Sequence, residues 1–236
     1  MASLTSKILR RLASPLGRLH YRLLFGRPGA LAAWSERWVR RLEAHSTRGD
    51  LPLDESAWDE QYRKGHWSYL RSPAELARYG VLVAFFQRLT PARSVLDVGC
   101  GEGILRDLLR RGGYERYVGV DLSAIAVEAA RRGADSRDEL IAADAEAFSA
   151  AETFDAVVLN ESLYYFHDPL AQAARYLAMT RPEGALIVSM FESARTRAIL
   201  RVLERRHAGA QSLRLEAERG AWLLAAFRRP PEDGAS

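Results

Sequence analysis

One stretch of ten residues, at positions 95–104, constrains the fold of this chain more than any other part. It reads Val-Leu-Asp-Val-Gly-Cys-Gly-Glu-Gly-Ile, and it opens with the short, mainly apolar run that is typical of a strand buried on both faces. Glycines follow at alternate positions, and glycine tolerates positive φ and lets a ligand approach the bare backbone. From Ile104 onward, leucines recur with helical spacing. The stretch predicts a strand, a glycine turn and a helix whose N-terminal end faces a backbone cradle.

The spacing of this turn narrows the class of ligand. G-x-G-x-G departs from the G-x-G-x-x-G of dinucleotide-binding folds, and no Lys-Ser/Thr pair of a phosphate-binding loop follows it. Glu102 lies inside the turn, where it would repel a pyrophosphate. Roughly 20 residues later a second predicted strand ends at Asp121, the place where an acidic side chain grips a ribose diol. We therefore expect a nucleoside with an amino-acid tail, not a nucleoside diphosphate.

Three motifs together resemble those of the class I S-adenosylmethionine-dependent methyltransferases. They are residues 95–103, Gly-Val-Asp-Leu-Ser at 119–123 and Ala-Asp-Ala at 143–145. The resemblance covers residues 93–227, and residues 154–166 look like the family's fourth strand and the segment that lines its active site. Within the family, the chain looks most like small-molecule and sugar methyltransferases of the nodulation N-methyltransferase type. The resemblance implies S-adenosyl-L-methionine as cofactor and S-adenosyl-L-homocysteine as product.

The resemblance also implies how that cofactor is held, because ligands of open α/β sheets lie at the carboxyl ends of the strands. The loop from Asp97 would hold the methionine moiety, Asp121 the ribose hydroxyls, and Asp144 the adenine amino group. Leu122 would pack on the adenine ring. The implied cofactor-binding residues are Asp97, Gly99, Cys100, Gly101, Asp121, Leu122, Asp144, Ala145 and Asn160. Cys100 is expected to be a small packing residue and not a nucleophile, since no base is paired with it.

Methyl transfer from a sulfonium is a direct displacement, so the protein mainly has to align donor and acceptor. A hydroxyl acceptor also needs a general base, whereas a neutral amine attacks unaided. The candidate bases are Glu161 and His167, with Tyr164 and Tyr165 as walls of the acceptor site. Each candidate base has an alternative role that stays open. His167 could instead cap the helix opened by Pro169, and Glu161 could point away from the acceptor. No His/Cys cluster has metal-ligand spacing, so we expect no metal.

Residues 58–69 hold four aromatic side chains and a histidine within twelve positions. Such a segment predicts a lid that closes over the cofactor and shapes the acceptor pocket. The candidate lid residues are Tyr62, His66, Trp67 and Tyr69. The alternative is that the rings simply bury against the sheet. The sequence from Ser72 to Glu75 then predicts a capping box at the start of a helix that continues through Leu89.

Charge is divided unevenly along the chain. Residues 1–41 carry nine basic side chains against the single acidic Glu36, a net +8, so the total of +4 leaves −4 for the remainder. Residues 4–24 and 31–42 show helical apolar spacing, the second with Trp34, Trp38 and Leu42 on one stripe. This arm is either a cap docked on the main domain, or a basic amphipathic segment that contacts an acidic membrane surface or partner. A cleaved transit peptide is a third option.

The order of elements predicts an α/β fold. We expect parallel strands at 94–98, 117–120, 139–142, 154–159 and 185–189 with helices between them, a turn at 182–184, and a final hairpin of strands at 212–216 and 221–228. The result is a Rossmann-like sheet of seven strands, mostly parallel with one antiparallel strand, with helices on both faces and an N-terminal helical extension. The predicted division is an arm at 1–50, an aromatic-rich lid at 51–92 and a cofactor-binding domain at 93–236.

Three functions follow from these features. The leading one is methylation of an oxygen or nitrogen of a small molecule, such as a sugar, glycolipid or natural-product intermediate. The alternatives are a non-catalytic cofactor-binding or scaffolding protein, and a protein or nucleic-acid methyltransferase. No nucleic-acid partner is expected, because the net positive charge lies in the arm and not in the domain that holds the glycine turn. One cysteine and the lack of a signal sequence or apolar span predict a cytoplasmic protein that is membrane-peripheral at most. The oligomeric state is left open.

Overall fold

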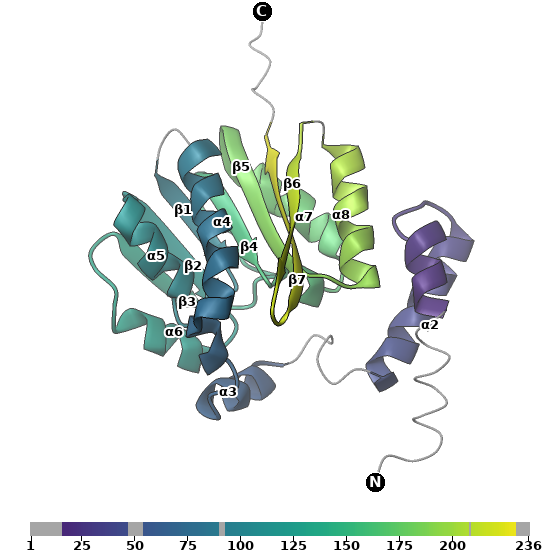
Figure 1. The fold of residues 1–236 in the computed structure, drawn as a ribbon, viewed down its shortest axis with the longest axis horizontal. Coiled ribbons are helices and arrows are strands. Elements are labelled where there is room, and N and C mark those ends of the chain that lie inside the picture. Colours follow the sequence, from purple (N-terminus) through teal and green to yellow (C-terminus); the bar gives the residue numbers. More distant parts are fainter. Residues whose placement is uncertain (1–15, 47–53, 90–92, 208, 230–236) are drawn as a thin grey trace, which may run out of the picture.

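The computed structural model describes residues 16–46, 54–89, 93–207 and 209–229. Its centre is a seven-stranded sheet of order β3-β2-β1-β4-β5-β7-β6 (Figure 1). The strands are β1 (Ser94–Val98), β2 (Arg116–Asp121), β3 (Asp138–Ala142), β4 (Phe154–Asn160), β5 (Thr180–Phe191), β6 (Gln211–Ala217) and β7 (Gly220–Arg228). Pairs from β3 to β5 are parallel, whereas β7 pairs antiparallel with both β5 and β6. The predicted mostly parallel sheet with one antiparallel strand is confirmed.

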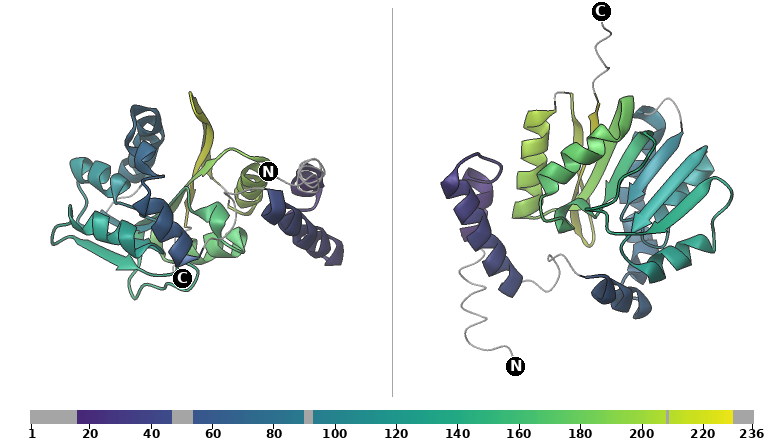
Figure 2. Two further views of the ribbon diagram at one scale, coloured as in Figure 1. Left: turned by 90° about the horizontal axis from the view of Figure 1, so that it is seen from below. Right: turned by 180° about the vertical axis from the view of Figure 1, so that it is seen from behind.

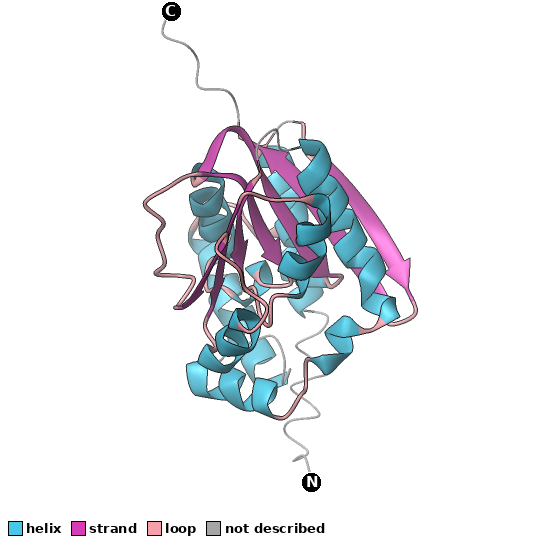
Figure 3. Cartoon of the chain, turned by 90° about the vertical axis from the view of Figure 1, so that its left-hand side faces the viewer, coloured by secondary structure: helices cyan, strands magenta, loops and turns pink. Residues whose placement is uncertain are grey.

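Helices cover both faces of this sheet (Figures 2 and 3). They are α3 (Glu55–Arg63), α4 (Pro73–Leu89), α5 (Ile104–Gly112), α6 (Ala124–Arg131), α7 (Pro169–Ala178) and α8 (Ala194–Arg206), with short 3-10 turns η1 (Ser68–Arg71) and η2 (Leu163–Tyr165). Alternate residues of each strand enter different cores: Val157 belongs to the cluster under α7 and α8, and Val158 to the cluster under α4, α5 and α6. The central strands are therefore apolar on both faces, as the sequence of β1 indicates.

Two local predictions are wrong. The predicted turn at residues 182–184 lies inside β5, where the register against β4 shifts between Phe154 and Ala156 and Glu183 has a φ of 62°. Strand pairing on both sides of this irregularity, at Thr180 and again from Ala185, keeps the segment within the strand. The capping box at the start of α4 does not form, because the Ser72 hydroxyl has no hydrogen-bond partner and Glu75 turns inward to Arg78.

The N-terminal arm forms two helices, residues 16–23 and α2 (Ala30–Ser46), joined by a turn around Gly26. It lies beside α8 (Figure 1), where Tyr21 and Phe25 join the core cluster under α7 and α8. The stripe that contains Trp34 and Trp38 faces solvent instead.

Predictions for residues 1–15 lie outside the described part of the chain, and the division into arm, lid and domain stays a prediction. Within the described ranges, none of the helices combines the length and hydrophobicity needed to cross a bilayer.

Candidate active site

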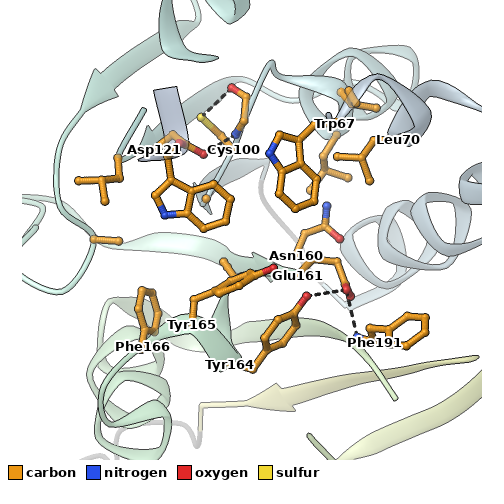
Figure 4. Close-up of a pocket in the computed structure, with 18 of the residues that line it drawn as sticks. Trp67, Leu70, Cys100, Asp121, Asn160, Glu161, Tyr164, Tyr165, Phe166 and Phe191 are labelled. Atoms are coloured by element: carbon orange, nitrogen blue, oxygen red, sulfur yellow. Dashed lines mark hydrogen bonds between the residues drawn. The ribbon is translucent and has the colours of Figure 1, made fainter. Parts of the chain in front are cut away.

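A cavity of about 940 Å³ opens at the carboxyl ends of β1, β2 and β4. The glycine turn and the residue after each strand form one side of it, and the segment from α3 to η1 forms another. Figure 4 shows Asp121, Cys100 and Trp67 across the cavity from Glu161, Tyr164 and Tyr165. This is the edge of the sheet at which ligands of open α/β folds bind.

The glycine turn gives this cavity a backbone floor. Gly99 and Gly101 line the cavity with φ values of 81° and 52°. A Cβ at Gly99 would lie 2.7 Å from the Cβ of Ser162, and a Cβ at Gly101 would lie 2.8 Å from the hydroxyl oxygen of Tyr62. Only glycine therefore leaves both the space and the backbone conformation that the turn requires.

Asp121 holds the turn together while lining the cavity. One carboxylate oxygen accepts from the backbone N–H of Gly101 at 2.8 Å, and the other accepts from the N–H of Ser123 at 2.9 Å. Burial raises the pKa of Asp121, although these backbone hydrogen bonds oppose that shift. The carboxylate is thus fixed in position, and Asp121 lines the end of the cavity where the resemblance places the ribose.

Asp97 lies behind the wall of the cavity and does not line it. Its side chain is 1% exposed, and one oxygen accepts from the Tyr117 hydroxyl at 2.7 Å. The other oxygen, Oδ1, is buried without a partner. Burial raises the pKa of Asp97 to about 7. In the structure Asp97 is therefore a buried residue of β1 that bonds Tyr117 of β2.

The other predicted cofactor residues gather along the same edge. Leu122, Asp144, Ala145 and Asn160 all line the cavity. Asp144 follows β3 and is exposed, with its carboxylate accepting from the N–H of Glu146 at 2.8 Å. Asp121 and Asp144 thus share one cavity, as the sequence predicts, with Asp97 one layer deeper.

Cys100 is buried within the turn, where its sulfur lies 3.7 Å from the carbonyl oxygen of Gly101. Burial raises the pKa of the Cys100 thiol well above its ordinary value. A thiol that stays protonated is a poor nucleophile, in agreement with a packing role.

The aromatic segment closes the cavity from the side of α3 and η1. Trp67 lies between Trp58 and Tyr69, with ring centroids 5.6 and 6.1 Å away, and Trp58 meets Tyr165 edge-on at 5.2 Å. The indole N–H of Trp67 is buried and has no partner among the described residues. Tyr62, Trp67 and Tyr69 line the cavity, whereas His66 is exposed and does not.

Asp59 fastens this segment to the cofactor side of the sheet. Its carboxylate accepts from the Ser123 hydroxyl at 2.6 Å and from the backbone N–H of Ile125 at 3.3 Å, at the N-terminus of α6. The aromatic segment therefore rests directly on the loop that follows Asp121. The sequence gives no signal for Asp59 beyond its place in an aromatic-rich segment.

Glu161 sits on the opposite wall in a left-handed conformation with a φ of 59°. Its carboxylate accepts from the hydroxyls of Ser189 at 2.8 Å and Tyr164 at 3.0 Å, and from the N–H of Phe191 at 3.0 Å (Figure 4). Burial raises the pKa of Glu161, against the opposing effects of Arg78 and these hydrogen bonds. A non-glycine residue at positive φ is costly and concentrates at functional sites.

Arg78 is a site residue that the sequence analysis missed. It is 1% exposed, lines the cavity from α4, and pairs with the equally buried Glu75 at 3.0 Å. It also donates to the side-chain oxygen of Asn160, and at 3.5 Å to the hydroxyl of Ser189. The signal in the sequence that could have identified Arg78 is its place within a mainly apolar predicted helix, three residues after Glu75.

The remaining wall comes from the last part of the chain. Phe191, Arg195, Arg219 and Trp222 line the cavity. The guanidinium of Arg219 stacks on Tyr69 at 4.0 Å, so the hairpin between β6 and β7 touches the lid. These residues had no recognisable motif, because their place in the site depends on the topology of β5, β7 and β6.

His167 lies at the rim. Its side chain is 72% exposed, and its Nδ1 lies 2.9 Å from a carboxylate oxygen of Glu146. It does not cap α7: Asp168 does, by accepting from the N–H groups of Leu170 and Ala171. The capping alternative for His167 is therefore wrong, and the histidine remains a rim residue of the cavity.

Residues 54–229 match the methyltransferase domain family. Because the match covers more than half of the chain, the chain belongs to this family.

Among the relatives, ribosomal protein L11 methyltransferase of Burkholderia multivorans is 38% identical over 105 residues, which are 44% of this chain and 33% of that protein. The chain thus spans about a third of the length of such relatives. Nodulation protein S of Bradyrhizobium diazoefficiens is 33% identical over 134 residues, or 55% of this chain and 62% of that protein. A solved structure of 1,6-didemethyltoxoflavin-N1-methyltransferase from Burkholderia thailandensis, with 1,6-didemethyltoxoflavin and S-adenosylhomocysteine bound, superposes with a TM-score of 0.61. It is 22% identical and covers 75% of this chain and 87% of its own.

The geometry of the site itself fits S-adenosyl-L-methionine. The glycine turn leaves room that any Cβ would fill, and Trp67, which lines the cavity, has a buried indole N–H without a partner among the described residues. Asp121 stands at the end of β2 and lines the cavity, where a ribose diol would bind. These features suit an amino-acid tail and a ribose at opposite ends of one ligand.

Substitution of Gly101 by alanine should weaken cofactor binding. The added Cβ would lie 2.8 Å from the hydroxyl oxygen of Tyr62, and the alanine would have to adopt the left-handed backbone conformation of Gly101. Backbone strain of this kind costs about 1–3 kcal/mol. We expect the dissociation constant for S-adenosyl-L-homocysteine, measured by isothermal titration, to rise at least about tenfold.

Gly65→Ala is the matched control. Gly65 also has a positive φ, of 67°, but a Cβ there meets nothing within 4 Å. An equal loss of affinity in both variants would show that the backbone at Gly101 is not part of the binding floor.

Proposed function

We propose that this enzyme methylates a nitrogen or oxygen atom of a small molecule bound in the half of the cavity away from the glycine turn. The observation that carries the proposal is the continuity of the cavity. One space is lined by the turn and Asp121 at one end, and by Tyr164, Tyr165 and Glu161 at the other. Donor and acceptor would therefore meet in a single chamber, as direct displacement requires.

The residues of the cofactor half would hold the donor as follows. Gly99 and Gly101 offer bare backbone to the methionine moiety, and Asp121 accepts from the ribose hydroxyls. Leu122, Asp144 and Ala145 surround the adenine. When bound, S-adenosyl-L-methionine supplies an electrophilic methyl group on a sulfonium. The faces of nearby aromatic rings such as Tyr62 and Trp67 suit that positive charge.

The walls of the acceptor half favour a compact, partly apolar molecule. Trp58, Trp67 and Tyr69 give flat apolar surfaces, while Glu161 and Arg78 give one polar anchor of each sign. A lid fastened through Asp59 restricts access to the chamber. Such a site suits a small cyclic acceptor better than a protein surface or a nucleic acid. A relative solved with 1,6-didemethyltoxoflavin supports an acceptor of that kind.

Glu161 is the proposed general base where the acceptor is a hydroxyl. Its carboxylate lies in the cavity wall, it is held by Ser189 and Tyr164, and its raised pKa makes it a stronger proton acceptor than an exposed glutamate. His167 is the weaker candidate, because it is mostly exposed and already paired with Glu146. Its proposed place is at the entrance of the acceptor half.

Transfer of a radiolabelled methyl group into fractionated cell lysate tests the function. We expect label in a small-molecule or lipid fraction, and binding of the donor by isothermal titration. Binding without transfer to any fraction would support a non-catalytic cofactor-binding protein. Label in protein or nucleic acid would support a macromolecular acceptor and contradict the proposal.

Glu161→Gln separates oxygen from nitrogen acceptors. For a hydroxyl acceptor we expect kcat to fall about a hundredfold or more, because a general base contributes on that scale. In the unchanged enzyme, kcat should fall as the pH drops through the pKa of Glu161, which lies above the usual 4.5. The measurement is the rate of methyl transfer to the labelled acceptor between pH 4 and 9.

Glu192→Gln is a suitable control, since Glu192 is paired with Arg197 and Arg214 outside the cavity. Unchanged affinity for S-adenosyl-L-homocysteine would show that the Glu161 variant keeps its donor site. An unaltered kcat would assign the acceptor atom to a neutral amine, or the base to another residue.

A further inference from the structure

The N-terminal arm carries an apolar stripe on each of its two helices, and both stripes face solvent. In the helix at residues 16–23 the stripe is Leu16, Leu19 and Leu23, which are 47–55% exposed. In α2 it is Leu31, Trp34 and Trp38, which are 49–64% exposed. Both sets follow i, i+3, i+7 spacing, so each lies along one side of its helix.

These stripes are exposed although the arm is docked. Other faces of the same helices bury Tyr21, Phe25 and Val39 in the core cluster under α7 and α8, and the His20 ring bonds the Ser35 hydroxyl at 2.9 Å between the two helices. The turn at Gly26 packs directly on Val202 of α8. Because the arm has its own buried contacts, the stripes are a second apolar surface with no partner in the described part of the chain.

The charge around these stripes is mainly positive, although α2 also contains Glu36 and Glu43. Exposed arginines lie on both helices and in the turn between them: Arg22, Arg27 and Arg37. Residues 1–41 have a net charge of +8, whereas the rest of the chain has −4. Exposed leucine and tryptophan side by side with arginine are the composition of helices that lie in the headgroup layer of an anionic bilayer.

We propose that this arm binds the surface of an anionic lipid bilayer, with both apolar stripes inserted among the headgroups and the arginines on lipid phosphates. Tryptophan suits this depth, because its ring is apolar and its N–H is polar. A second copy of the chain is a poorer occupant, since a two-fold contact would bring together two arms that each carry a net positive charge, +8 over residues 1–41. In Figures 1 and 2 the arm stands at the side of the molecule, and the end of α2 reaches the level of α3.

Co-sedimentation of the full chain with vesicles tests this proposal. We expect binding to vesicles that contain phosphatidylglycerol, loss of most binding to pure phosphatidylcholine vesicles, and weakening as salt rises from low to physiological levels. Trp34→Ser/Trp38→Ser and, separately, Arg22→Gln/Arg27→Gln/Arg37→Gln should each reduce the bound fraction at a fixed lipid concentration at least about tenfold.

Leu213→Ser is the matched control, because Leu213 is 38% exposed on β6, away from the arm. It should bind vesicles like the unchanged chain, and thermal unfolding should show that all variants stay folded. Absence of binding to anionic vesicles at low salt, or equal binding by the arm variants, would overturn the proposal. Light scattering that shows a dimer dissociated by Trp34→Ser/Trp38→Ser would overturn it as well, and would assign the face to a second copy.

Discussion

Replacement of Arg78 by methionine should lower the free energy of unfolding by about 3–5 kcal/mol, the usual cost of removing one partner of a buried ion pair. Arg78 and Glu75 are 1% and 2% exposed and lie 3.0 Å apart. Without the guanidinium, the buried carboxylate of Glu75 keeps only the more distant Arg219, at 4.0 Å. Asn160 and Ser189 lose a donor at the same time. Urea unfolding followed by far-ultraviolet circular dichroism measures the change.

Two further variants make this result specific. Arg88→Met removes an exposed arginine from the same helix and should change stability by less than about 0.5 kcal/mol. The double variant Glu75→Gln/Arg78→Met should be more stable than Arg78→Met alone, because the orphaned charge is gone. Equal destabilisation by Arg78→Met and Arg88→Met would contradict the buried pair.

The ligand-free protein should lose stability as the pH rises from 4 to 8, in part because of Asp97. The pKa of this carboxyl is about 7 in the folded protein against 3.8 in its ordinary range. The folded state therefore binds the proton more tightly than the unfolded state does. The resulting stabilisation is complete below pH 3.8 and disappears as the pH rises through 7. Its full size is about 4 kcal/mol at 1.36 kcal/mol per pH unit.

Asp97→Asn isolates this contribution. The amide cannot ionise, and its oxygen can still accept from the Tyr117 hydroxyl. The stability difference between the variant and the unchanged protein, taken from urea unfolding at several pH values, should therefore shift in favour of the variant as the pH rises. Glu115→Gln, at an exposed position before β2, should leave the pH dependence as it is. A constant difference between pH 4 and 8 would rule out a protonated Asp97.

The sheet could be predicted because its strands follow local rules. β1 is found at its predicted residues, Ser94–Val98, since a short run apolar on both faces has few other uses in an α/β chain. β5 was predicted too short, because Pro182 and Gly184 are typical turn residues and only the pairing of Phe154 with Thr180 keeps that segment in the sheet. Tertiary pairing overrides local turn preference there.

The cofactor end of the site was visible in the sequence for the same reason: its residues lie one after another at strand ends. The acceptor end was not. Arg78 meets Asn160 across 82 positions, and Glu161 depends on a hydroxyl from β5. In the arm, helical spacing identified the tryptophan stripe but could not show which side is buried. That choice depends on the bond between His20 and Ser35 and on contacts with α8.

The position of the aromatic segment has a consequence for redesigning the enzyme's selectivity. Tyr62 touches the glycine turn, while Trp58, a turn of helix earlier, touches Tyr165 on the far wall. One helix thus serves both halves of the chamber, so replacing its rings to admit a bulkier acceptor should also disturb affinity for the donor. Phe191 and Trp222 come from β5 and β7, where their rings meet edge-on at 5.6 Å. They are the better positions at which to retarget the enzyme while leaving its methyl donor undisturbed.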